Sequence, residues 1–357
     1  MNHNKLKLKS LAAGSKTFLS GGILLIILAA LGFSSPAGQQ AAKETGISAK
    51  KYSTVAVDEK NIKWFVTENG VVSFDGTKWK LHGSNDNLPS DVNHLALAFS
   101  ASGPELLVAS SNGATVASLP PDPQKGTRVF KASDSPSMGD KVSRVAAGSN
   151  LLKWFATDKG IAAYGDGKWM KPEYTSYYPV ELFEEFPITS LGTNAAGDTL
   201  YVGTYGAGVA RIFKNNDLDA ISGASEYAIW GPIIMPSDTI QSIYIARDGS
   251  KWFGTNLGIA QHTGSNTLDN WTVYTTEEGL VNDDVQAITA DLKGNYWFGT
   301  KGGISVFNGS SWTTYTRSNG LNSDNILCLG VDKDGVVWIG TDNGVNSFRD
   351  GQFTSYR

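Results

Sequence analysis

The chain has 357 residues, of which 41% are hydrophobic and 18% are charged, with a formal net charge of −4. Nucleic acid and anionic membranes require a cationic face, so this charge balance argues against both as partners. Cys328 is the single cysteine and cannot form an internal disulfide. It stands in the apolar alternation 326–331, where we expect a buried packing residue.

The first 37 residues are typical of an export signal. Residues 1–16 carry four lysines and no acid, and the apolar run that follows is strongest at 23–31. The run is short for a membrane span, and the small residues Ser35 and Ala37 favour cleavage after Ala37. We expect a signal peptide and a periplasmic or secreted protein. The alternative is an uncleaved N-terminal anchor, the one case in which membrane contact is expected.

The rest of the chain repeats one unit. In the sixth copy an apolar–polar alternation at 285–290 precedes three β-prone runs at 297–300, 304–307 and 312–315, with turn signals between them. The copies are anchored, 41 to 51 residues apart, at Trp64, Leu107, Trp154, Tyr201, Trp252, Trp297 and Trp338. Each unit therefore contains four short strands.

Seven such units predict an all-β fold, a single seven-bladed β-propeller of four-stranded blades over residues 46–357, preceded by a lead-in at 38–45. Units one and seven each have all four strands. We therefore expect the ring to close by packing of blade seven on blade one, with strand exchange between the termini as the alternative. The propeller is expected to be a monomer.

Most recurring residues have a packing explanation. Aromatic anchors in mid-strand are expected to fill the space between blades, and the threonine after each W-x-G is expected to bond to the backbone of the next turn. Glycines at the third position of that motif let neighbouring sheets approach closely, as expected for Gly203, Gly254, Gly299 and Gly340. Residues 332–335 look like the start of a calcium loop, but their counterparts lack the acids, so we expect a hairpin turn there.

The recurring pattern D-x-x-G-x-x-W-[FI]-G-T-x-x-G-[IV], preceded by G-L-x-[SN]-D, resembles the two-component regulator propeller repeat. It is clearest at 248–259, 291–304 and 332–345, and the resemblance covers residues 46–357. It implies the exported sensing part of a receptor, often carbohydrate-binding, with a membrane helix and a histidine kinase behind it. No kinase is expected in this sequence, so the resemblance implies binding of a ligand or partner rather than phosphotransfer.

Catalysis finds little support in the residues. His82, His94 and His262 are not spaced as a metal cluster, and no nucleophile elbow is present. We expect no catalytic residues, no metal and no cofactor. The less favoured alternative is an enzyme similar to the streptogramin lyases, whose propellers have W-F-T repeats and a catalytic His and Glu, although no motif here carries those roles over.

Binding is expected on one rim of the ring. In a propeller, the loops between the second and third strands share a rim with the connections between blades, and repeats vary their binding loops while keeping the framework. One residue per blade in these loops is a candidate: Glu68, Ser111, Asp158, Tyr205, Asn256, Lys301 and Asp342.

Two insertions belong to the same rim. Residues 120–141 are rich in Pro, Ser and Asp and predict a flexible crossing, whereas 172–187 concentrates aromatics. Tyr174, Tyr177 and Tyr178 of the second insertion are predicted ligand-binding residues, either as a stacking platform or as part of a lid. The ligand is expected to be a small molecule such as a glycan, with an envelope protein–protein scaffold as the alternative.

Overall fold

The computed structural model describes residue 43 and residues 45–148, 151–173, 183, 185–215, 220–227, 234–264 and 270–357. The expected export segment, 1–37, lies outside this part of the chain.

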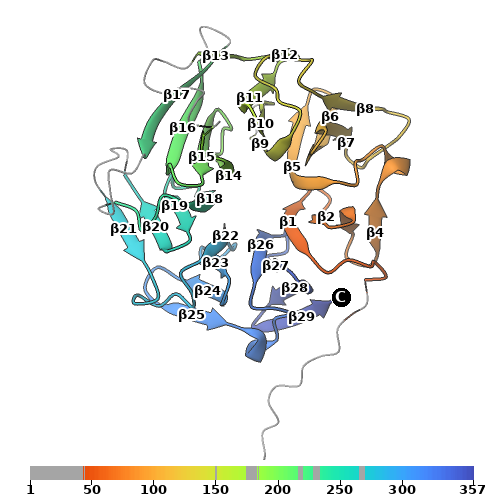
Figure 1. Cartoon of the computed structure of the whole chain (residues 1–357). Helices are drawn as coiled ribbons and strands as arrows, with labels where there is room; N and C mark the ends of the chain where they lie inside the picture. Colours follow the sequence, from red (N-terminus) through yellow and green to blue (C-terminus); the bar gives the residue numbers. More distant parts are fainter. Residues whose placement is uncertain are drawn as a thin grey trace, which may run out of the picture. The chain divides into compact units, whose positions relative to one another are not determined.

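Seven sheets stand as blades around a central axis, with the first strand of each blade innermost (Figure 1). Blades one to four comprise β1 (Tyr52–Val57), β2 (Lys63–Thr67), β3 (Gly70–Phe74) and β4 (Trp79–His82); β5 (Val92–Ser100), β6 (Gly103–Ser110), β7 (Gly113–Ser118) and β8 (Thr127–Phe130); β9 (Val142–Ala147), β10 (Lys153–Thr157), β11 (Gly160–Gly165) and β12 (Lys168–Trp169); and β14 (Ile188–Thr193), β15 (Thr199–Thr204), β16 (Val209–Asn215) and β17 (Ala220–Tyr227). Blades five to seven comprise β18 (Ile240–Ile245), β19 (Lys251–Thr255), β20 (Gly258–His262) and β21 (Trp271–Tyr274); β22 (Val285–Ala290), β23 (Tyr296–Thr300), β24 (Gly303–Phe307) and β25 (Trp312–Tyr315); and β26 (Ile326–Val331), β27 (Val337–Thr341), β28 (Gly344–Arg349) and β29 (Gln352–Tyr356). Two 3₁₀ helices, η1 (Ser84–Asp86) and η2 (Arg317–Asn319), lie in connections between blades. The predicted seven-bladed all-β fold is confirmed.

Blade four has a fifth strand that the repeat pattern does not predict. β13 (Lys171–Glu173) pairs in parallel with β17, at the outer edge of the sheet. The insertion at 172–187 therefore begins by adding to blade four, before the chain reaches the innermost strand β14.

The innermost strand of every blade carries a β-bulge at its second residue, where the pairing with the next strand skips one position. A bulge bends a strand and re-aims a side chain. The skipped residues are Ser53, Asn93, Ser143, Thr189, Gln241, Gln286 and Leu327. Six of these seven are polar, although each follows an apolar or aromatic residue.

The repeated residues pack as expected. The seven anchor side chains are at most 6% exposed, and they lie in clusters that join neighbouring blades. A Cβ on Gly299 would come within 2.5 Å of Ile326 Cγ2 in the next blade, so glycine permits the close approach. In all seven blades a Thr or Ser hydroxyl donates at 2.8–3.1 Å to the carbonyl of the glycine that ends the turn: Thr67, Ser110, Thr157, Thr204, Thr255, Thr300 and Thr341.

The aspartate six residues before an anchor tryptophan bonds to its indole. Asp58, Asp291 and Asp332 accept the Nε1–H of Trp64, Trp297 and Trp338 at 2.9–3.0 Å. The same carboxylates accept two backbone N–H groups of their own turn, which fixes the turn and the ring together.

Blade five lacks this bond. Ala246 stands six residues before Trp252, whose buried Nε1 has no hydrogen-bond partner in the described chain. The backbone of its turn nevertheless has the same hydrogen bonds, from Ala246 N to Ser250 O and from Gly249 N to Ala246 O.

The ring closes between blades seven and one by face packing, as expected. Tyr52, Phe65 and Phe74 share one core cluster with Trp338 and Tyr356. Each of the two blades has its own four strands. In the described part of the lead-in, Lys43 forms a parallel bridge with Tyr356, outside the named strands.

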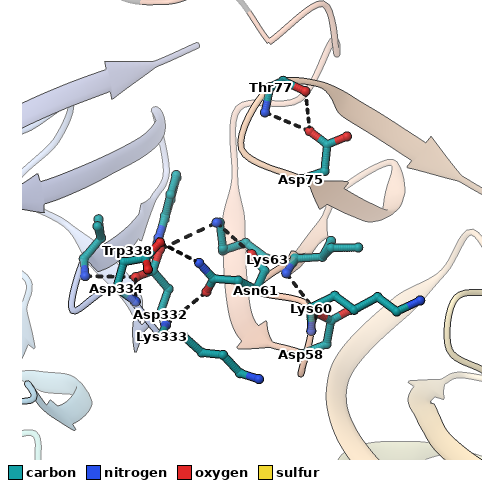
Figure 2. A network of polar contacts seen from close by, with 12 residues as sticks. Asp58, Lys60, Asn61, Lys63, Asp75, Thr77, Asp332, Lys333, Asp334 and Trp338 are labelled. Atoms are coloured by element: carbon teal, nitrogen blue, oxygen red, sulfur yellow. Dashed lines mark hydrogen bonds and ion pairs between the residues drawn. The ribbon is translucent and has the colours of Figure 1, made fainter.

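Polar contacts also join blades seven and one, at the rim formed by the turns between the first and second strands (Figure 2). Lys63 Nζ lies 3.6 Å from Asp332 Oδ2, and both side chains are at most 5% exposed. Asn61 Nδ2 donates to Asp334 Oδ2 at 2.9 Å, and Lys333 N donates to Asn61 Oδ1 at 3.0 Å. The first turn of blade one is thus bonded to the first turn of blade seven.

Candidate functional site: rim and central channel

The predicted rim exists in the described part of the ring. The turn between the second and third strands of a blade bonds to the neighbouring inter-blade connection, for example from Gly258 N to Asp283 O at 2.8 Å and from Gly344 N to Lys50 O at 2.7 Å. Turns and connections therefore alternate around one edge, and the innermost strands begin at that same edge.

Several of the predicted rim residues bond to the connections. Glu68 accepts Lys50 N at 2.6 Å and Lys51 N at 2.9 Å. Burial raises the pKa of Glu68, but these hydrogen bonds outweigh it, and the net pKa is lowered. The other contacts are Ser111 N to Asp91 Oδ2 (3.1 Å), Lys141 N to Asp158 Oδ1 (3.4 Å), Lys301 Nζ to Asp284 Oδ2 (2.7 Å) and Asn325 Nδ2 to Asp342 Oδ2 (3.0 Å). These side chains hold the rim together, which is a framework role available with or without a ligand.

Tyr205 and Asn256 differ from this group because, among the described residues, their side chains have no hydrogen bond to a connection. All seven candidates are exposed, and the Tyr205 side chain is 63% exposed. Leu257, beside Asn256, is 55% exposed. The turns of blades four and five therefore present exposed side chains that do not hold the rim together.

The aromatic insertion is described only at its two ends, in β13 and at residues 183 and 185–187. Tyr174, Tyr177 and Tyr178 lie outside the described residues, so their binding role stays a prediction. Phe183 is buried against blade three, and Phe186 lies over Gly206 in the turn next to Tyr205. The end of the insertion thus packs onto blades three and four.

A central channel forms a second candidate site, which the sequence analysis did not single out. The innermost strands of all seven blades line a cavity of about 230 Å³. Most of the bulge residues line it, together with the next residue of each strand: Thr54, His94, Arg144, Ser190, Ser242, Ala287 and Cys328. The signal was present in six of the seven repeats as a polar residue after the first apolar or aromatic residue of the unit, as in Val285-Gln286.

Inner-strand side chains join neighbouring blades at five of the seven seams in the described chain. They donate to the backbone carbonyl of the first residue of the following inner strand: Asn93 to Val142 (2.8 Å), Thr189 to Ile240, Ser242 to Val285 (3.2 Å), Gln286 to Ile326 (3.2 Å) and Cys328 to Tyr52 (3.5 Å). The polar ring is therefore partly structural. Hydroxyl and amide oxygens keep acceptor capacity after donating, so these groups can still contact a ligand.

Two ionisable groups, His94 and Arg144, lie on neighbouring inner strands of this channel. Burial is the main cause that lowers the pKa of His94 to about 3, and the charge of Arg144 lowers it further. A backbone hydrogen bond to Val145 raises the pKa but is outweighed. Burial also lowers the pKa of Arg144, yet a guanidinium remains protonated at neutral pH. The pair therefore contributes one positive charge.

A Ser–His–Asp arrangement occurs in blade one. His82 Nε2 lies 2.9 Å from Ser73 Oγ, and His82 Nδ1 lies 3.1 Å from Asp86 Oδ2. The His82 ring contacts Trp64 at a tilt, at the place where Tyr315 stacks on Trp297, so it occupies the position of a packing tyrosine. Ser73 and His82 are both buried, which leaves the hydroxyl no access to a substrate.

Metal and membrane features are absent from the described residues. No group of three or more His, Cys, Asp or Glu there could hold a metal ion. Among the same residues, no helix has the length and apolar character needed to cross a membrane.

Residues 320–343 match the family model of the two-component regulator propeller. The matched residues run from the connection before blade seven to the turn after β27, the stretch in which the sequence pattern is clearest. No curated protein matches the sequence.

Solved propellers share the fold. The extracellular domain of the hybrid two-component system BT3049 from B. thetaiotaomicron is 22% identical, with a TM-score of 0.67 over 85% of this chain and 39% of that one. This chain thus spans well under half of that domain. Virginiamycin B lyase from Staphylococcus aureus is 16% identical (TM-score 0.55, 82% and 92% covered). The Swd1 propeller of Myceliophteria thermophila is 13% identical (TM-score 0.57, 84% and 96% covered). A two-component system domain, a lyase and the Swd1 propeller all match, so these likenesses establish the fold and not the function.

Proposed function

We propose that the chain is an exported, non-catalytic sensing propeller that binds a small polar ligand, such as a glycan, at the rim and channel mouth. The single observation that carries the proposal is the polar ring of inner-strand bulges. These bulges lie at the second residue of each inner strand, at the same edge as the predicted binding loops. Hydrogen-bonding groups in a concave site are what a small polar ligand requires.

The repeat type and the N-terminal segment support the sensing and export parts of the proposal. The repeat is that of two-component regulators, and one matching structure is the extracellular domain of such a system. The lysine-rich start and apolar run of residues 1–31 favour export.

The channel chemistry supports binding over catalysis. Its lining contains no carboxylate, and its histidine is held neutral by burial. A general acid–base pair of groups poised near neutral pH is therefore not found among the lining residues. An envelope scaffold finds no specific support, because the described exposed large hydrophobic side chains are spread over five blades rather than gathered in one patch.

The test is binding by the mature exported protein to a glycan array and to fractionated envelope extracts. Tyr205→Ala and the double change Tyr177→Ala with Tyr178→Ala should each weaken binding by about 1–3 kcal/mol, the cost of losing an interface aromatic. Leu292→Ala is the matched control, since Leu292 is 65% exposed in a first turn, at the other rim. Unchanged affinity in both tyrosine variants would place the site elsewhere, and capture of only a protein from the extracts would favour the scaffold.

A further inference from the structure

Arg144 is a half-buried cation that lines the channel, and none of the described residues gives it an acidic partner. Lys63 lies 3.6 Å from Asp332, and Lys153 Nζ lies 2.9 Å from Glu105 Oε2. No ion pair of the described residues includes Arg144, whose Nη1 donates to the carbonyl of Ser143 at 2.9 Å. A cation removed from water without a counter-charge is unfavourable.

The framework does not require an arginine at this position. The equivalent residues, defined by their pairing with the second strand, are Thr54, His94, Ser190, Ser242, Ala287 and Cys328. None of these is a long cationic side chain. Arg144 is therefore a feature of blade three and not of the repeat.

The surroundings of Arg144 suit an oxyanion. None of the residues that line the channel is Asp or Glu, so no lining carboxylate competes for the guanidinium. One of its five N–H donors is engaged with Ser143, and the planar fork matches a carboxylate or sulfate.

We propose that the channel binds the oxyanion group, carboxylate or sulfate, of a sugar-sized acidic ligand, with Arg144 as its counter-charge. This rests on the proposed ligand-binding function and names the chemical class of the ligand. A cavity of about 230 Å³ limits the bound portion to roughly one sugar unit. The ligand would therefore be an acidic monosaccharide or the acidic end of a longer glycan.

Titration calorimetry of the mature protein at neutral pH and fixed ionic strength tests the proposal. The titrants are glucuronate, glucose 6-sulfate, inorganic sulfate and neutral glucose. Glucuronate or glucose 6-sulfate should bind saturably and at least tenfold more tightly than glucose. Tight binding of inorganic sulfate alone would show a simple anion site and overturn the acidic-sugar assignment.

Three variants separate charge, shape and general effects. Arg144→Gln removes the charge and should weaken binding of the acidic sugars at least tenfold. Arg144→Lys keeps the charge without the fork and should retain part of the affinity. Lys293→Gln, which removes an exposed charge in the first turn of blade six at the other rim, should leave it unchanged.

Stability without any titrant gives a second measurement. At low ionic strength Arg144→Gln should melt at or above the temperature of the wild type, because the unpaired charge is gone. A clear loss of stability would assign Arg144 a structural role and overturn the proposal, as would acidic titrants that fail to bind. Neutral glycans that bind the wild type and Arg144→Gln equally would overturn this inference while leaving the proposed ligand-binding function intact.

Discussion

Replacing Ala246 with aspartate should stabilise the protein by giving Trp252 its missing acceptor. In blades one, six and seven an aspartate at this place accepts the indole N–H at 2.9–3.0 Å, whereas the Nε1 of Trp252 is buried without a partner. The turn backbone in blade five has the same hydrogen bonds as the turn that begins at Asp332, so the new carboxylate should reach the same place.

The expected magnitude follows from the bonds gained. An unsatisfied buried donor costs about 1–3 kcal/mol, and a hydrogen bond to a charged group contributes about 1.5–3 kcal/mol, but burial of the carboxylate offsets part of this gain. Ser250 N is already satisfied by Asp248 Oδ1 at 2.9 Å, so the indole bond is the main gain. We expect a net increase of about 1–2 kcal/mol in the free energy of unfolding at neutral pH.

Chemical denaturation and calorimetry measure the effect. With an unfolding entropy of roughly 2 cal/mol/K per residue, the gain corresponds to a rise in Tm of about 2–3 °C. Trp252→Phe removes the donor, so Ala246→Asp should give no gain in that background. A destabilised Ala246→Asp protein, or an equal gain with and without the indole, would refute the reasoning.

Two further predictions concern the other aspartates of this series. Asp332→Ala should destabilise the protein by about 3–5 kcal/mol in denaturant titration, because it leaves buried Lys63 without its counter-charge. Asp350→Asn on the exposed surface is the control and should change the stability little. Similar effects of the two changes would contradict this role of Asp332. Burial raises the pKa of Asp291, but its hydrogen bonds from Asn295, Trp297 and the turn backbone outweigh it, and the net pKa is lowered. The stability that Asp291 contributes is therefore present above its unfolded pKa of about 4 and is lost as pH falls through the lower folded pKa. The difference in stability between wild type and Asp291→Asn should shrink on acidification. A difference that does not depend on pH would exclude this linkage.

Much of the fold could be predicted because the sequence repeats it. The spacing of the seven anchors gives the number of blades. The run that begins at each anchor predicts a strand and a turn bond in every copy, and its glycine predicts a close approach in blades four to seven. Strand β13 could not be predicted, because its parallel pairing with β17 joins segments far apart in the chain and follows no repeat. The hydrogen bond between each turn aspartate and its anchor tryptophan could not be predicted either, since a spacing of six residues does not show that the carboxylate accepts the indole N–H.

The binding residues were harder to predict for a physical reason. A variable polar residue at a turn serves equally well as a ligand contact or as a bond to the neighbouring connection, and Glu68 and Lys301 make the second kind of contact. Channel residues were missed because the bulge breaks the simple alternation of inward and outward side chains. Arg144 could have been found by comparing the seven copies of that position, since its equivalents include no other long cationic side chain.

The hydrogen bond from the Cys328 thiol to the Tyr52 carbonyl makes this cysteine a natural probe for opening of the ring between blades seven and one. The thiol lies in the seam between the last blade and the first, and burial raises the pKa of Cys328 to about 12, so the closed ring keeps it protonated and shielded. A thiol reagent can reach it only when the seam parts. Because Cys328 is the single cysteine, its labelling rate in the unmodified protein reads the frequency of seam opening directly, with no engineered label needed.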